Sequence, residues 1–306
     1  MYFCARMKHQ LSILLPVYNV DCRQLVAELS RQVQALSDVL SYETIVADDG
    51  STDRSLAELC REVSRHPCCR YVERSENVGR AAIRNFLARQ ARYDWLLFLD
   101  SDVTVASPHF ISTYLDAQHP ATTAIVDGGI AIAPCDALER CNLRYRYEVH
   151  EQPRHTAAQR SQHPYRAFRT TNFMVRRDAM LHIPFDERIR TYGFEDVLFG
   201  KQMHQHGQQI RHIDNPVMLT DIEPNDVFLR KTEQSLHTLH QFRHDLRGYS
   251  RLLTFADGLH SPLLRSAFLV WHRLFRGLER RNLQGSRPSL RLFKLYTIGY
   301  FLSIKQ

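Results

Sequence analysis

Apolar runs and amphipathic segments alternate along the first hundred residues of the chain. The runs have the length of buried strands, and the segments between them carry apolar residues at helical spacing. The pattern predicts strands at residues 11–16, 43–47, 71–73 and 95–99 and helices at 21–37, 53–65 and 80–92. Strands that alternate with helices are typical of βαβ units, so we predict an α/β fold with a mainly parallel sheet flanked by helices.

The alternation is lost between residues 105 and 170. Residues 142–163 are polar, rich in Arg, His and Gln and without a clear period, which is typical of a mobile loop near a binding site. Residues 210–213 predict a late strand, and apolar residues return at helical spacing after Asn225. Residues 231–306 predict a basic, aromatic-rich helical C-terminal extension.

The net charge of +7 is concentrated at the C-terminal end of the chain. From Ser261 onward there are nine Lys and Arg residues and one acid, Glu279. Two interpretations remain open: a helical subdomain that packs on the sheet and shows a basic face, or peripheral contact with an anionic membrane surface. No recognised nucleic-acid motif accompanies these bases, so no nucleic acid is expected as a partner.

Composition places the chain among ordinary soluble globular proteins, with 44% hydrophobic and 24% charged residues. The N-terminal residues do not resemble a secretory signal, and no run is long enough to span a bilayer as a helix. Seven cysteines are irregularly spaced, which predicts free thiols in a reducing compartment. We therefore expect a cytoplasmic protein, with the inner face of the membrane as the site of any peripheral contact.

Polar side chains gather where the predicted strands end. The parallel strands would bring these ends to one crevice, where such sheets bind ligands. The residues concerned are Tyr18, Asn19, Asp48, Asp49, Asn77, Asp100 and Asp102. Asp100 and Asp102 share a side of the extended chain and suit a hard divalent cation bound to phosphate oxygens. The alternative is that these two acids only form a turn and a cap.

The segment Asp48 to Asp53 follows a strand and opens a helix. Gly50 suits the bend, and Ser51, Thr52 or Asp53 suits the N-cap. Turn chemistry does not explain two carboxylates at the strand end. A carboxylate there can accept a hydrogen bond from a nucleobase imide, and Tyr18 can stack on the base.

Four segments in this order resemble the motifs of family 2 glycosyltransferases. They are Leu15–Asn19, Asp48–Asp53, Asn77–Asn85 and Leu99–Asp102. The resemblance covers roughly residues 10–230. It implies a GT-A fold for residues 1–230, with a nucleotide-binding half at about 1–104 and an acceptor-binding half at 105–230.

The resemblance also implies a donor site. Its residues would be Pro16, Tyr18, Asp48, Asp49, Asn77, Arg80, Arg84 and Asp100. Tyr18 and Asp49 would hold the base, usually uracil, with Asp48 beside them. Asn77, Arg80 and Arg84 lie where the family contacts the nucleotide and its phosphates. For both arginines a solvated helix face is an equal alternative.

The metal is expected to be Mn²⁺ or Mg²⁺. In the family, Asp100 would approach the ribose and the metal, and Asp102 would bind the metal directly. Many relatives complete the metal site with a His, where this chain has Leu219. His212, Asp214 and Asp221 are alternative ligands that the sequence does not separate, whereas His204 and His206 are expected at the surface.

Glu195 and Asp196 open a segment with helical spacing that ends at Gly207. One interpretation is that Asp196 only caps this helix. The resemblance implies that Asp196 is the general base of an inverting transfer and that Glu195 positions the acceptor. Asn172, Gly193 and Phe194 are the other acceptor-side candidates, whereas Phe173 and Val175 are expected in the core.

The prediction is an inverting, metal-dependent glycosyltransferase that uses a nucleotide sugar, with a UDP-sugar favoured. Its acceptor would be a glycan or a lipid-linked saccharide. The alternatives are a nucleotidyltransferase and a non-catalytic protein that binds a nucleotide sugar or nucleic acid. No glycine-rich, lysine-containing phosphate loop supports the nucleotidyltransferase.

Overall fold

A seven-stranded sheet forms the centre of the protein in the computed structural model, which describes residues 8–118 and 123–304. The strand order is β3-β2-β1-β4-β8-β6-β9. The strands are β1 (His9–Val17), β2 (Leu40–Asp48), β3 (Cys69–Glu73), β4 (Trp95–Leu99), β6 (Thr123–Asp127), β8 (Asn172–Arg176) and β9 (Gln209–His212). The first four are parallel, and β8 runs antiparallel to both of its neighbours. The predicted α/β fold with a mainly parallel sheet is confirmed.

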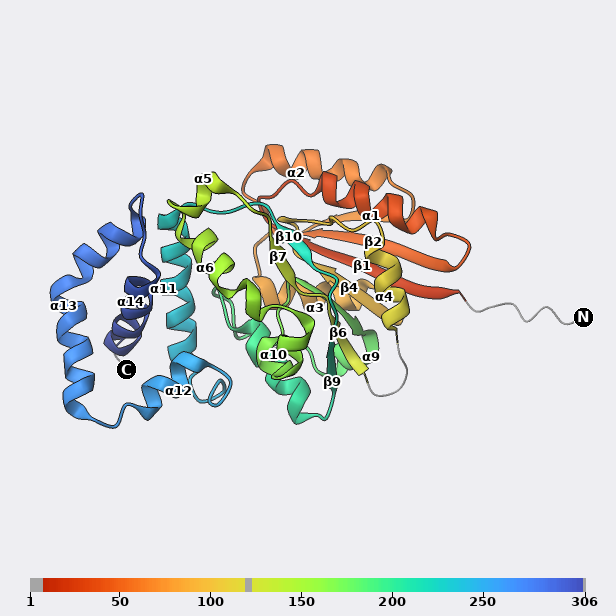
Figure 1. Cartoon of the computed structure of the whole chain (residues 1–306). Helices are drawn as coiled ribbons and strands as arrows, with labels where there is room; N and C mark the ends of the chain where they lie inside the picture. Colours follow the sequence, from red (N-terminus) through yellow and green to blue (C-terminus); the bar gives the residue numbers. More distant parts are fainter. Residues whose placement is uncertain (1–7, 119–122, 305–306) are drawn as a thin grey trace, which may run out of the picture.

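Helices cover both faces of this sheet. Along β1 successive side chains enter different cores: Ile13 packs on one side of the sheet and Leu14 on the other. Figure 1 shows α1 and α2 lying together along one face. The helices around the sheet are α1 (Arg23–Ala35), α2 (Arg54–Arg61), α3 (Arg80–Gln90), α4 (Phe110–Ala117), α9 (Arg177–His182) and α10 (Glu195–Gln205).

The predicted strands and helices of the first hundred residues are all present, with ends shifted by a few residues. The segment predicted as one helix at 53–65 is α2 followed by a 3₁₀ turn at Glu62–Arg65. Asp53 is the N-cap of α2, and its carboxylate accepts from the N–H groups of Ser55 and Leu56. The turn chemistry predicted for this segment is therefore confirmed.

A second sheet of three short strands lies next to the first. Its order is β5-β10-β7, formed by Val103–Thr104, Val217–Leu219 and Ile130–Ile132. In the antiparallel pair of β10 with β5, Leu219 lies opposite Val103. Leu219 is thereby held beside the turn that carries Asp102.

The prediction of a mobile loop at residues 142–163 is wrong, because this segment is largely helical. It contains α6 (Leu143–Glu151), a 3₁₀ turn at Gln152–Arg154 and α7 (Ala157–Ser161), between α5 (Asp136–Glu139) and α8 (Pro164–Ala167). Asn142 caps α6 by accepting from the N–H of Tyr145. These helices are short and bury few apolar residues, so they leave no long apolar period in the sequence.

Four helices form the C-terminal part of the protein. They are α11 (Asn225–Gln241), α12 (Arg251–Gly258), α13 (Pro262–Gln284) and α14 (Leu290–Ser303). Figure 1 shows them at one end of the molecule, with α13 farthest from the sheet. The boundary expected at residue 230 falls inside α11. No helix within the described residues is long and apolar enough to cross a membrane.

Candidate functional site

The loops that follow β1 and β2 are tied together at the carboxyl edge of the sheet. The N–H of Asn19 donates to the Ser51 hydroxyl over 2.8 Å, and the N–H of Asp53 donates to Asn19 Oδ1 over 2.9 Å. Asn19 adopts a left-handed φ of 52°, which asparagine tolerates. The neighbouring Tyr18 ring is 42% exposed and is free to meet a ligand.

Asp48 and Asp49 are both buried at the end of β2. Asp48 accepts from the Tyr71 hydroxyl over 2.6 Å and from the N–H of Ser51 over 2.7 Å. Asp49 accepts from the N–H groups of Val78 and Gly79 over 3.1 and 3.0 Å. Burial raises the pKa of Asp49. Asp49 thus fixes the loop that carries the exposed Asn77 next to the end of β2. Pro16 lies on the adjoining strand opposite Ala47.

A network of four charged side chains joins α3 to the ends of β4 and α10. Arg84 donates to one Asp100 oxygen over 2.5 Å, and Arg80 donates to the other over 3.0 Å. The Arg80 Nε also donates to Glu195 over 2.7 Å. Burial alone would raise the pKa of Asp100, but Arg80 and Arg84 outweigh it and hold this pKa below its usual value.

Arg84 is only 1% exposed, so the alternative of a solvated helix face is wrong for this residue. Its guanidinium is directed to Asp100 rather than to an open surface. Arg80 is less buried, and its guanidinium lies over the ring of Tyr192. Of the two arginines, only Arg80 therefore faces the candidate site.

Asp102 has no ion-pair partner among the described residues. Burial and the charge of Asp100 raise its pKa. No group of three or more His, Cys, Asp or Glu side chains that could hold a metal occurs within residues 8–118 and 123–304. Asp102 fits a hard cation of the kind that is held by one or two carboxylates and completed by phosphate oxygens and water.

The alternative metal ligands do not gather around Asp102. His212 is buried and pairs with Asp127 over 3.2 Å and with Arg160 over 2.9 Å. Asp214 and Asp221 are exposed, and Asp214 accepts from the N–H of Ala157. His204 and His206 are also exposed, which confirms their predicted surface position.

A cavity of about 190 Å³ lies at the start of α10, lined among others by Gly193, Phe194, Glu195 and Asp196. Gly193 and Phe194 have left-handed φ values of 96° and 68° and turn the chain into the helix. A Cβ on residue 193 would lie 2.7 Å from the Ser235 Cβ, so only glycine fits there. This turn directs Asp196 at the cavity.

Burial, followed by the charge of Glu195, raises the pKa of Asp196 to about 6. Its position in the helix is the second, after the N-cap Phe194 and Glu195, and no side chain caps the helix from the N-cap position. A carboxylate with this pKa can accept a proton at neutral pH and still release it.

Arginines from outside the predicted site also line the cavity. Arg144 pairs with Glu223 over 2.9 Å, and Arg169 pairs with Glu148 over 3.7 Å. Arg144 lies near Asp102, and Arg169 lies near Asp196. The sequence pointed to neither residue, because Arg144 belongs to the segment without a clear period and Arg169 follows it.

Asn172 does not reach this cavity, which corrects its predicted place in the acceptor site. The side chain is 1% exposed. Its Oδ1 accepts from the Tyr114 hydroxyl, and its Nδ2 donates to the carbonyls of Gly129 and Asn215. Every polar atom of the amide is used to join β8 to the neighbouring turns. Phe173 and Val175 are fully buried, as predicted.

The sequence model of glycosyl transferase family 2 matches residues 12–183, which is more than half of the chain. The chain belongs to this family. The match contains the strand-end carboxylates and three members of the charged network, Arg80, Arg84 and Asp100. It ends before Glu195 and Asp196, whose roles therefore need separate support.

Curated relatives are similar over parts of the chain. A validoxylamine A glucosyltransferase from Streptomyces hygroscopicus subsp. limoneus is 27% identical over 226 residues, covering 64% of this chain and 48% of the relative. A poly(ribitol-phosphate) beta-glucosyltransferase from Bacillus spizizenii is 34% identical over 107 residues, covering 34% of this chain and 17% of the relative. The chain thus spans about half or less of the length of these relatives.

Solved structures share the fold. A mannosyltransferase from Pyrobaculum calidifontis, in complex with GDP-Man and Mn²⁺, superposes with a TM-score of 0.58 at 14% identity, covering 96% of this chain and 85% of that one. Glucosyl-3-phosphoglycerate synthase from Mycobacterium tuberculosis, in complex with Mn²⁺ and UDP, gives 0.51 at 16% identity, covering 76% and 79%.

The fold of the chain is therefore the GT-A fold of these solved glycosyltransferases. The family membership favours the predicted glycosyltransferase over the alternatives of a nucleotidyltransferase and a non-catalytic binding protein.

Proposed function

We propose that the protein is an inverting glycosyltransferase that moves a sugar from a nucleotide-sugar donor to a hydroxyl group of a glycan or a lipid-linked saccharide. The observation that carries this proposal is Asp196, a carboxylate with a pKa raised to about 6 that lines a cavity at the start of α10. An inverting transfer needs a base that is ionised at neutral pH and faces the acceptor.

In this mechanism Asp196 takes the proton of the acceptor hydroxyl while its oxygen attacks the anomeric carbon. The new C–O bond forms on the face opposite the bond to the diphosphate, which breaks with its electron pair on the phosphate oxygen. The configuration at the anomeric carbon is inverted as a result. Glu195, held by Arg80, keeps the first turn of α10 in place and contributes to the position of the acceptor.

For the donor, we propose that Tyr18 stacks on the base, with Asp48, Asp49, Asn77 and Pro16 forming the pocket around it. Arg80 would meet the diphosphate. A divalent metal, Mn²⁺ or Mg²⁺, would be held by Asp102, with Asp100 nearby. The metal would stabilise the charge that develops on the diphosphate. The Mn²⁺ complexes of the two solved relatives support the choice of metal.

The donor nucleotide is proposed to be UDP. The glucosyl-3-phosphoglycerate synthase complex contains UDP, whereas the mannosyltransferase complex contains GDP-Man, so both nucleotides belong in the test. We also propose a saccharide acceptor near the inner face of a membrane, with peripheral contact made by the basic C-terminal helices.

The test compares Asp196→Asn, Asp102→Asn and Asp221→Asn, the last being an exposed acid away from the cavity lining. Thermal shifts with UDP, GDP and their sugar conjugates, with and without Mn²⁺, report binding, because a ligand of the folded state raises Tm. We expect Asp196→Asn to keep the Mn²⁺-dependent shift and to lose about 10²- to 10⁴-fold in transfer rate. Asp102→Asn should lose the Mn²⁺-dependent shift, and Asp221→Asn should match the wild type.

The separate parts of the proposal fail in different ways. Transfer by Asp196→Asn at the wild-type rate would remove the base assignment. A shift with GDP in place of UDP would correct the donor. A product whose anomeric configuration matches the donor by NMR would contradict inversion, and a wild type that no nucleotide stabilises would contradict the donor site.

A further inference from the structure

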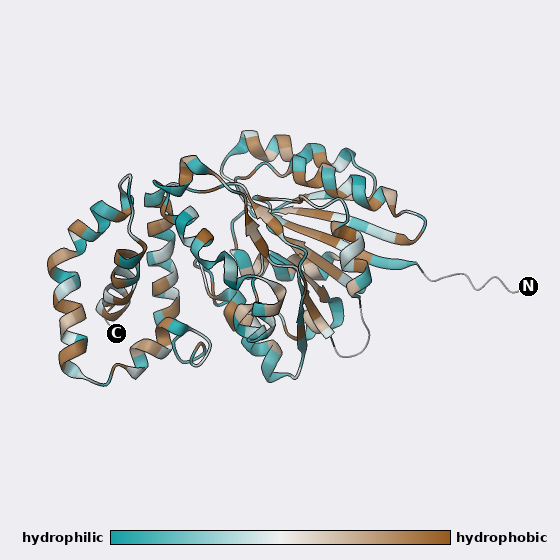
Figure 2. Cartoon of the chain, in the orientation of Figure 1, coloured by the Kyte–Doolittle hydropathy of each residue, from teal (hydrophilic) through white to brown (hydrophobic). Residues whose placement is uncertain are grey.

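Helix α13 carries a stripe of exposed apolar side chains. Leu263, Leu274 and Leu278 are 83%, 68% and 62% exposed, and Leu264, Val270 and Trp271 are also exposed. Within the described part of the chain, the five large apolar side chains that are more than half exposed all lie on α13, and Trp271 is 41% exposed beside them. In Figure 2 hydrophobic segments recur along α13, on the outermost helix of the molecule.

The stripe lies on one side of the helix. Leu263, Val270, Leu274 and Leu278 follow one another at intervals of seven, four and four residues, which keeps them on one face. The opposite face packs inward and buries His272, Glu279 and Leu283. The stripe is therefore separate from the core of the C-terminal helices and has no partner within the described residues.

The charge around this stripe is almost entirely positive. Arg273 adjoins Leu274, and Arg281 follows Leu278 by three residues on the same face. Glu279 is buried and accepts from Trp271 and the His272 ring, so it offers no exposed negative charge. Five further cations form no ion pair with a carboxylate among the described residues, but they do not border the stripe: Arg265 and Arg276 line a hollow with His272 on the inward side of α13, and Arg287, Arg291 and Lys294 lie at the start of α14.

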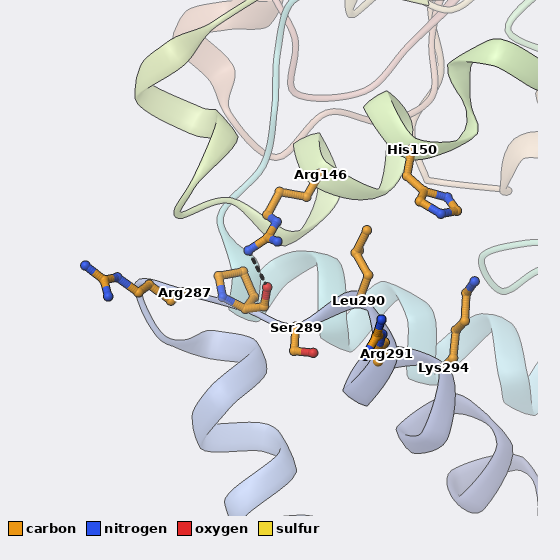
Figure 3. Close-up of a pocket in the computed structure, with 8 residues that line it drawn as sticks. Arg146, His150, Arg287, Ser289, Leu290, Arg291 and Lys294 are labelled. Carbon is orange, nitrogen blue, oxygen red and sulfur yellow. Dashed lines mark hydrogen bonds between the residues drawn. The ribbon is translucent and has the colours of Figure 1, made fainter.

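A second basic feature, a depression of about 520 Å³, lies between α6 and the start of α14. Figure 3 shows Arg146 and His150 on α6 above Arg291 and Lys294 on α14, whereas Arg287 points away. Arg146 donates to the Pro288 carbonyl over 2.7 Å, which fixes the turn before α14 against α6. Among the described residues, no carboxylate lines the depression.

These features select among the surfaces that could cover α13. A second copy of the chain would bring two positively charged helices together without exposed carboxylates between them, which is unfavourable. An anionic lipid bilayer offers hydrocarbon to the leucines and phosphates to the arginines at the same time. Trp271 suits the boundary between the two regions, where tryptophan is enriched.

We propose that α13 lies in the surface of an anionic bilayer, with its leucine stripe in the acyl boundary and with Arg273 and Arg281 on lipid phosphates. This deepens the peripheral membrane contact proposed above and rests on it, but it does not depend on the transfer chemistry. The surface would hold the cavity of Asp196 near acceptors that are anchored to lipid.

The experiment is co-sedimentation of the whole protein with vesicles of phosphatidylglycerol and phosphatidylcholine, compared with phosphatidylcholine alone. We expect binding to the anionic vesicles that weakens as salt is raised, together with a blue shift of tryptophan fluorescence. The shift should vanish in Trp271→Phe, because the other tryptophan, Trp95, lies in the central sheet.

Leu274→Glu with Leu278→Glu should weaken vesicle binding at least tenfold, and Arg273→Gln with Arg281→Gln should weaken it at low salt. Leu59→Glu, an exposed leucine on α2, is the matched control and should bind as the wild type does. Circular dichroism checks that each variant is folded. We expect all of them to fold, because the replaced side chains are exposed.

Two outcomes would overturn the proposal: no binding of the wild type to anionic vesicles, or equal binding by the Leu274→Glu and Leu278→Glu double variant. Light scattering tests whether a second copy of the chain covers the stripe instead. If the wild type is a dimer and the double variant is a monomer, the stripe is a dimer interface and the membrane contact is overturned. The Mn²⁺-dependent nucleotide shift is measured on the same samples. Its absence, with vesicle binding retained, would contradict the donor site alone.

Discussion

At the scale of single residues, the four charges at the base of the site depend on one another. Arg80 and Arg84 face Asp100 and Glu195, so two positive and two negative side chains share one partly buried space. Removing one member leaves the opposite charges with fewer partners in a place that water reaches poorly. The network therefore fixes α3, β4 and α10 relative to one another before any ligand binds.

Replacing Arg84 tests this dependence. Arg84→Met should lower the free energy of unfolding by about 3 kcal/mol, because Asp100 loses its 2.5 Å partner while it remains buried. Arg89→Met lies on the same helix, where Arg89 is exposed and pairs with Glu187 only at 3.8 Å, and should change stability by about 0.5 kcal/mol or less. Urea unfolding of both variants measures the difference, and equal values would show that Arg84 is not structural.

Asp196 predicts how activity depends on pH. Since the base must be ionised, kcat/KM should rise about tenfold per pH unit below pH 6 and level off above it. In Asp196→Asn the residual rate should lose this titration. A wild-type profile that is flat between pH 5 and 7, at constant protein stability, would contradict the assignment.

The same residue affects stability with a definite sign. Its pKa is raised from an ordinary 3.8 to about 6 in the folded protein, so the unfolded chain releases its proton first as pH rises. Stability from this group is complete below about pH 4 and is lost as pH rises to about 6. Asp196→Asn should therefore be more stable than the wild type at pH 7, by about 3 kcal/mol for a shift of about two pKa units, and the two should converge at low pH. Thermal unfolding at pH 7 and pH 4 checks this, and a destabilised Asp196→Asn would contradict it.

At the scale of elements, the turns that follow the strands decide where the site residues lie. Gly50 has a φ of 72° at the turn between β2 and α2. A Cβ there would lie 2.5 Å from the backbone carbon of Glu76 and 2.7 Å from the nitrogen of Asn77. The close approach lets the N–H groups that follow Asn77 reach the carboxylate of Asp49.

Gly50→Ala should consequently cost at least about 2 kcal/mol, from left-handed strain and from the clash with this backbone. Gly207→Ala separates the two causes, since Gly207 has a φ of 68° but open space around it. We expect Gly207→Ala to cost about 1 kcal/mol. Calorimetry of both variants measures the excess for Gly50, and an excess of zero would mean that the loop moves away freely.

The elements that the sequence predicts well are those with a strong period. The buried run Trp95–Leu99 is β4 with the predicted ends, because a strand covered on both faces is continuously apolar. The acids after it and the turn at Asp53 were found for similar local reasons. Arg144 and Arg169 were not, since their role depends on short polar helices whose positions are set by distant partners such as Glu223.

The sequence also did not predict which residues of the expected site are buried in the folded protein. Asn172 has the polarity of a ligand contact, but its amide joins Gly129, Asn215 and Tyr114. Arg84 has the position of a phosphate ligand and lies under Asp100 instead. Sequence patterns gave the side chains near the site, whereas long-range packing decided which of them remain open to it.

At the scale of the whole molecule, α6 connects the candidate site to the C-terminal helices. Arg144 and Glu148 line the cavity of Asp196, whereas Arg146 and His150, on another face of the same helix, line the basic depression. Any movement of α6 against α14 would therefore also move the side chains of Arg144 and Glu148 that line the cavity. The contact is held by Asn225 at the start of α11, which accepts from the N–H of Leu143 over 2.6 Å.

Asn225 also donates to the carbonyls of Cys141 and Gly285, over 2.8 and 3.0 Å, and so joins three chain segments. Asn225→Ala should cost about 1–3 kcal/mol, because three backbone groups lose their partner. The loss should be local: hydrogen exchange should accelerate in α6, α13 and α14 while β1 and β4 stay protected. Asp226→Ala, which removes only an exposed pair with Arg230, is the control and should leave exchange unchanged. Equal acceleration in the central sheet would show that the C-terminal helices and the sheet unfold as one unit. It would contradict a local loss of structure around α6.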